Sequence, residues 1–75
     1  MILPTKHISE SQALVGIGAV LIDALNRPLT VTGLWEKVRD LHVVGTFERF
    51  VLALDMLFIL GLVNLSEGLI EKEKV

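Results

Sequence analysis

The chain has 75 residues, of which 52% are hydrophobic and 21% charged, with no cysteine and a formal net charge of −2. A single domain of this length buries roughly 60% of the surface that its unfolded chain exposes, which leaves little core for an enzyme pocket of about 300–1,000 Å³. The composition excludes a disordered chain, a disulfide framework and a cysteine zinc site, and the acidic balance is unlike that of a dedicated nucleic-acid binder.

The first predicted elements are an extended arm and a helix. Residues 1–8 include Pro4, which disfavours helix at the preceding residue, so this arm is expected to be extended. Ser9 is predicted to cap a helix over residues 10–25, with Gln12 as its capping-box partner. Helical spacing places the apolar residues of this helix on one face, namely Leu14, Ile17, Leu21, Ala24 and Leu25.

A short β-like stretch and a second helix follow. Pro28 ends the first helix, and residues 29–31, Leu-Thr-Val, have the character of a strand. Thr32 is predicted to cap a helix over residues 33–41. The apolar face of this second helix is predicted to be Leu34, Trp35, Val38 and Leu41. For Trp35, a place in the core is favoured over a role as an interface anchor.

The third helix is the most informative segment. It is predicted over residues 47–60, with Thr46 as its cap and Gly61 just beyond its end. One face is expected to form the core, namely Phe47, Phe50, Val51, Leu54, Leu57 and Phe58. The opposite face is also largely aliphatic, whereas the outer face of a surface helix is normally polar.

The last predicted element is a β-hairpin. Residues 62–65 and 69–71 have the character of strands, and residues 66–68 that of a turn, so that a wing forms over residues 62–73. Helix, short strand, helix, helix and hairpin is the order of a winged helix-turn-helix domain. We therefore predict a mainly α fold with a small β-hairpin, in a single winged-helix-like domain over residues 1–75.

The aliphatic outer face of the third helix predicts a protein-contact site. A domain of this size cannot surround one helix on all sides, so this face meets either the wing and the arm or another chain. The candidate site residues are Arg49, Leu52, Asp55, Met56 and Ile59, extended by Ile2 and Leu3 of the arm.

Two other classes of function stay open. A small DNA-binding transcriptional regulator requires a cationic surface, which Lys37, Arg39, His42 and Arg49 would have to supply. We do not expect nucleic-acid binding by the third helix, because it offers one arginine among aliphatic and acidic residues. A homo-oligomer is also expected, in its simplest form a dimer with the first or the third helix at the two-fold axis.

Neither a metal site nor a catalytic site is expected. His7 and His42 lack the spacing and the companion ligands of a metal pair, and Asp23 and Asp55 are not accompanied by a nucleophile or a phosphate loop. We therefore predict a protein without enzymatic activity and without a cofactor.

Two glycines within the first helix need an explanation. Gly16 and Gly18 each cost a helix about 1 kcal/mol relative to alanine. Either another backbone approaches closely there or the glycines are simply tolerated.

Two apolar runs of the sequence are too short to be membrane spans. Residues 13–25 contain Asp23, residues 50–63 contain Asp55, and neither run reaches the roughly 20 residues of a spanning helix. The N-terminus does not match a signal peptide. A cytoplasmic protein without a membrane segment is expected.

Several segments of the chain carry a resemblance to one known family, namely residues 1–4 (Met-Ile-Leu-Pro), 29–31, 34–39 (Leu-Trp-Glu-Lys-Val-Arg), 47–55 and 60–63. They resemble the ABC-three component system middle component 6 family. The resemblance implies a prokaryotic conflict or defence system that combines an ABC-type ATPase, a small middle component and an effector. It implies that the middle component links the ATPase to the effector, and it implies no catalytic residues.

Overall fold

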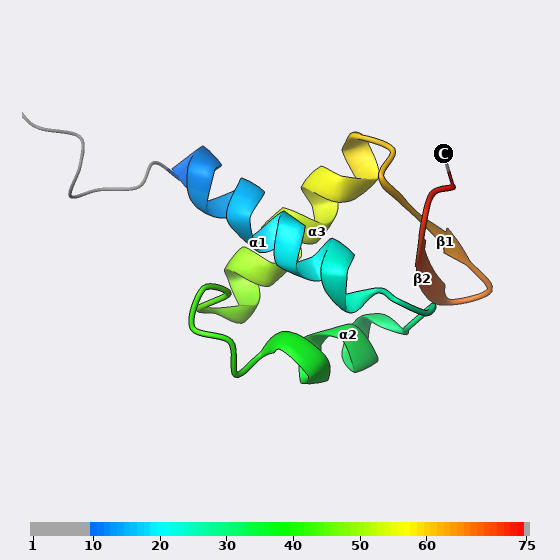
Figure 1. Cartoon of the computed structure of the whole chain (residues 1–75), viewed down its shortest axis with the longest axis horizontal. Helices are drawn as coiled ribbons and strands as arrows, with labels where there is room; N and C mark the ends of the chain where they lie inside the picture. The colour runs from blue at the N-terminus through cyan, green and yellow to red at the C-terminus, as the bar shows by residue number, and fades with distance from the viewer. Residues whose placement is uncertain (1–9, 75) are drawn as a thin grey trace, which may run out of the picture.

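Three helices and one hairpin make up the fold. A computed structural model describes residues 10–74, and Figure 1 shows the three helices packed together with the hairpin at one side. The elements are α1 (Glu10–Ala24), α2 (Val31–Val38), α3 (Phe47–Ile59), β1 (Val63–Ser66) and β2 (Leu69–Lys72). This mainly helical arrangement confirms the predicted winged-helix-like class. The arm over residues 1–8 and the Ser9 cap lie outside the described residues.

The wing is a tight antiparallel hairpin. Strands β1 and β2 pair antiparallel from Val63 opposite Lys72 to Ser66 opposite Leu69. The two-residue turn has Glu67 at φ 53° and Gly68 at φ 79°, as the favoured type of hairpin turn requires. A hairpin over the predicted residues is therefore confirmed.

The predicted β-like stretch contributes a single residue to this sheet. The amide of Leu29 donates to the Ile70 carbonyl at 3.0 Å, and the amide of Ile70 donates to the Leu29 carbonyl at 2.7 Å. This bridge fastens the segment before α2 to the wing. The chain then turns into the helix at once, because Thr30 is already the N-cap.

The predicted start and end of the second helix were wrong. The Thr30 hydroxyl, not that of Thr32, accepts the amide of Gly33 at 2.9 Å, so α2 begins two residues earlier than predicted. The helix also ends at Val38, and Leu41 lies beyond it with 46% of its surface exposed. The bridge at Leu29 accounts for the early start, because it holds the residue directly before Thr30 in the sheet, so that Thr30 caps the first helical turn.

The third helix has the predicted cap and the predicted glycine after it, and it ends at Ile59, one residue before the predicted end. The Thr46 hydroxyl accepts the amide of Arg49 at 3.1 Å. At the other end, Gly61 has φ +74°, its amide donates to the Phe58 carbonyl at 3.0 Å, and the amide of Leu62 donates to the Leu57 carbonyl at 2.9 Å. This pair of bonds is a Schellman motif, which fixes the direction in which the chain leaves the helix.

The core lies where the three helices and the wing meet. Its fully buried side chains include Ile17 and Leu21 from α1, Leu34 from α2, Phe50 from α3 and Ile70 from β2. The predicted apolar face of the first helix is thus confirmed.

An aromatic cluster extends this core. The ring of Trp35 lies 5.1 Å from that of Phe47 and 5.2 Å from that of Phe50, measured between centroids. Trp35 packs against the core, whereas Phe47, predicted to be part of the core, lies at its edge and is about half exposed.

Candidate protein-contact site

The exposed side of α3 is partly aliphatic. Residues Glu48, Leu52, Asp55 and Ile59 are all exposed, and their spacings of four, three and four residues place them along one side of the helix. The buried residues of α3 lie on the other side, namely Phe50, Ala53, Leu54 and Leu57. We call the four exposed residues the outward face.

Two aliphatic side chains are prominent on the outward face. Ile59 is 84% exposed and Leu52 is 45% exposed, so neither is covered by the wing. Glu48 and Asp55 lie beside them, so the outward face combines two aliphatic and two acidic side chains. An aliphatic surface with a charged border is typical of a protein-contact surface.

The structure divides the predicted site residues between two sides of α3. Leu52, Asp55 and Ile59 share the outward face, but Arg49 and Met56 lie on the side of the helix next to α1. Arg49 forms an exposed ion pair with Glu10, the first residue of α1, with 3.4 Å between Nη2 and Oε1. Ile2 and Leu3 lie outside the described residues.

Met56 is partly buried because it packs against α1. A Cβ atom added at Gly18 of α1 would lie 2.8 Å from the Met56 Cε and 3.3 Å from the Leu57 Cδ2. The absence of a side chain at Gly18 therefore lets side chains of α3, from the same chain, pack closely against α1. At Gly16 an added Cβ would meet nothing within 4 Å, so this glycine is tolerated rather than required.

An open apolar groove runs beside the outward face, between α1, the end of α3 and the end of β2. Its volume is about 460 Å³, and Asp23 and Lys72 are the charged residues that line it. Its aliphatic lining includes Val15, Ala19, Ile22, Met56, Leu60 and Leu62. We call this feature the α1–α3 groove.

Sequence reasoning missed this groove, although α1 carries a signal for it. Val15, Ala19 and Ile22 follow each other at spacings of four and three residues, on a different side of α1 from Leu21 and Leu25. A helix with a second apolar stripe needs a second packing partner, because the outer face of a surface helix is normally polar.

Three of the four basic side chains required for a DNA-binding surface, those of Lys37, Arg39 and Arg49, are engaged within the chain, and His42 is exposed. The ammonium of Lys37 donates to the Ala24 carbonyl at 2.7 Å and thereby caps the end of α1. Arg39 pairs with Glu36 at 3.2 Å and lies over the Trp35 ring, 5.7 Å from its centroid. Arg49 pairs with Glu10, as described above. These contacts and the acids of α3 leave no cationic stripe on the helix that would enter a groove of DNA.

The described part of the chain contains neither a candidate metal-binding cluster nor a membrane-spanning helix. Within residues 10–74, no group of three or more His, Cys, Asp or Glu side chains is arranged to hold a metal ion. In the same part of the chain, no helix is both long enough and apolar enough to cross a bilayer.

Comparison with known families gives one result that spans nearly the whole chain. A family model described as "ABC-three component (ABC-3C) system Middle Component 6" matches residues 3–73. This match confirms the resemblance drawn from the sequence. No curated protein and no solved structure matches the chain significantly.

Proposed function

Since the chain belongs to the ABC-three component system middle component 6 family, we propose that it is a non-enzymatic adaptor that links the ABC-type ATPase of such a system to its effector. Membership in the family makes the chain one component of a multi-component system, so that it has protein partners. The adaptor acts in the cytoplasm of a prokaryotic cell, as part of a conflict or defence response.

The observation that carries this proposal is the outward face of α3. Leu52 and Ile59 expose aliphatic surface. Burial of this surface against a partner would favour association by about 25 cal/mol per Å². Arg49 and Met56, the other predicted site residues of this helix, border the same surface on the side of α1.

The charges of the outward face define the kind of partner surface that fits it. Glu48 and Asp55 favour a partner with an apolar centre and basic residues around it, because opposite charges at the border raise the association rate and exclude wrong partners. The same two acids repel the phosphates of DNA, and no observation favours the transcriptional regulator as a second candidate.

Co-purification tests the proposal. The chain, carrying an affinity tag, is expressed together with the ATPase and the effector of its own system. Replacing Leu52 with Asp and Ile59 with Lys should release at least one of the two components, since charges then replace the aliphatic centre. The matched control is Val43→Lys, which changes a half-exposed aliphatic residue in the loop before α3.

The two outcomes are distinct. Loss of a component from the double variant, with retention by the Val43→Lys control, supports the adaptor surface. Retention of both components by a double variant that melts like the wild type contradicts it.

A further inference from the structure

The α1–α3 groove has projecting aliphatic residues at its own rim. Leu60 is 61% exposed and Val15 is 60% exposed, and both line the groove. Leu60 is the C-cap of α3, and Val15 lies on α1, so the two residues project from different elements. A surface that carries both a groove and projecting side chains can be complementary to a second copy of itself, because the side chains of each copy can enter the groove of the other.

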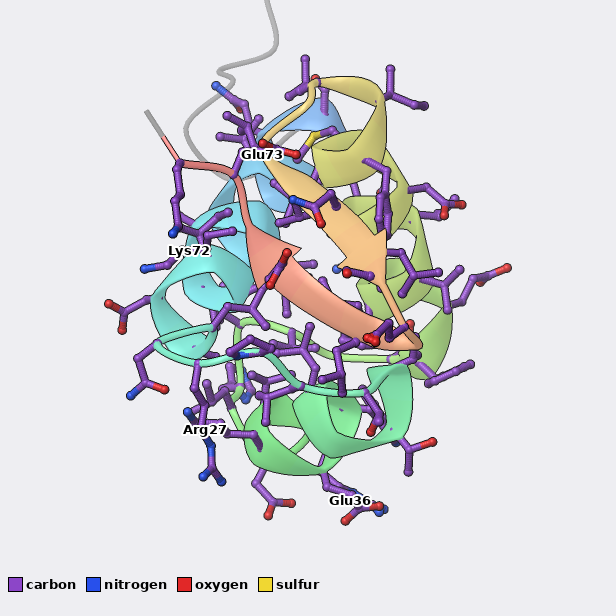
Figure 2. All side chains as sticks on the ribbon, turned by 90° about the vertical axis from the view of Figure 1, so that its right-hand side faces the viewer. Arg27, Glu36, Lys72 and Glu73 are labelled. Atoms are coloured by element: carbon purple, nitrogen blue, oxygen red, sulfur yellow. The ribbon has the colours of Figure 1, made fainter. Side chains whose placement is uncertain are left out.

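The charges at the groove are also self-complementary. Asp23 lies in the last turn of α1 and Lys72 at the end of β2, and Figure 2 shows Lys72 extending from β2 on the side where α1 runs. Within residues 10–74, neither side chain takes part in an ion pair or a side-chain hydrogen bond. Across a two-fold axis, the acid of each copy is free to pair with the base of the other.

The dimensions agree with such a contact. A volume of about 460 Å³ holds roughly four aliphatic side chains, if each carbon atom takes about 30 Å³, the share of one molecule in liquid water. The larger branched side chains of the lining that are exposed or half-buried can interdigitate with their counterparts, namely Val15, Ile22, Leu60 and Leu62.

We propose that the occupant of the α1–α3 groove is a second copy of this chain. The two copies form a two-fold symmetric dimer in which Leu60 of each enters the groove of the other, and Asp23 of each faces Lys72 of the other. This inference does not rest on the adaptor function, because it is argued from the lining and the charges of the groove alone.

The first test is the solution mass over a dilution series, measured by light scattering or sedimentation equilibrium. The wild type should have twice the chain mass of 8.3 kDa at micromolar concentration. Leu60→Lys should raise the dissociation constant of the dimer by about 100-fold, because it places a charge at the centre of the contact. The fold should survive this change, since Leu60 is exposed and a lysine at the end of a helix is favourable.

The matched control is again Val43→Lys. Val43 is an exposed aliphatic residue that precedes the start of α3, whereas Leu60 follows its end, so the control should dimerise like the wild type. A monomeric wild type at all concentrations, or a Leu60→Lys variant that dimerises like the control, overturns the proposal.

A charge exchange gives the second test. Asp23→Lys and Lys72→Asp should each weaken the homodimer, because each sets like charges against each other twice across the axis. An equimolar mixture of the two variants should recover a dimer, since one chain then carries two bases and the other two acids. Failure of the mixture to associate more tightly than either variant alone overturns the arrangement.

The two proposals fail separately. A monomeric chain that still co-purifies with the ATPase or the effector ends the dimer inference and leaves the adaptor. A dimer that captures neither component contradicts the proposed adaptor function and supports the proposed dimer.

Discussion

Gly16 and Gly18 lie two residues apart on α1, and replacing each with alanine tests how closely α1 packs on α3. An alanine gains about 1 kcal/mol over glycine inside a helix at either position. At Gly16 the added Cβ meets nothing within 4 Å, so the whole gain should appear as stability.

At Gly18 the same gain meets an opposing contact. The added Cβ would lie 2.8 Å from the terminal methyl of Met56, which can swing aside, and 3.3 Å from a methyl of Leu57, which is buried and has little room. Overpacking of a core costs about 1–3 kcal/mol, and the flexible methionine places this case at the lower end. The gain and the cost should therefore nearly cancel.

Thermal unfolding followed by circular dichroism measures the difference. Gly16→Ala should raise the Tm by about 4–8 °C, the equivalent of 1 kcal/mol for a domain of this size, and Gly18→Ala should leave it nearly unchanged. The comparison is made at several low protein concentrations, so that association does not contribute. Equal increases for both variants would refute the close approach of α1 and α3 at Gly18.

Four further substitutions test the caps and the core. Thr30→Ala should lower the free energy of unfolding by about 1 kcal/mol, and Thr32→Ala should change it by less than about 0.5 kcal/mol. Urea unfolding of both variants measures the two changes. A larger loss for Thr32→Ala than for Thr30→Ala would show that Thr32 is the N-cap, as the sequence predicted. Gly61→Ala should cost about 1–2 kcal/mol in the same assay, because φ there is +74°, and an unchanged midpoint would argue against the left-handed turn after α3. Phe50→Ala should cost about 3–5 kcal/mol and leave the domain largely unfolded, which circular dichroism at 25 °C would reveal as lost helix signal; a native spectrum would show that the ring is not the centre of the core.

Local signals were sufficient to predict α3 and the wing. Thr46 before the helix, Gly61 after it and the Glu67-Gly68 pair at the turn each have a local conformational effect, and each acts in the structure as expected. Such signals require no knowledge of the rest of the fold.

The second helix shows where local signals end. Thr30 and Thr32 are both competent N-caps, and only the bridge between Leu29 and Ile70, 41 residues apart in sequence, selects the first of them. Leu41 lies at helical spacing from Val38 in the sequence, but α2 ends at Val38, so this spacing does not place Leu41 on the face of a helix.

The candidate site divides in the same way. The periodicity of α3 was enough to predict that Leu52 and Ile59 face away from the core. It could not show that Met56 packs against α1, because that depends on where α1 crosses. The α1–α3 groove is formed by elements far apart in the chain. The second apolar stripe of α1 indicates that another neighbour is needed, but it does not indicate which element lies beside it.

Site-specific cross-linking in the assembled system tests most directly whether the outward face of α3 is the adaptor surface. A photoreactive phenylalanine analogue is placed at position 52, and in a separate control at position 43, in the chain bound to the purified ATPase and effector. The account predicts a cross-link from position 52 to one of these two proteins and none from position 43. A cross-link from position 43 alone, in a complex that is fully assembled, would contradict it.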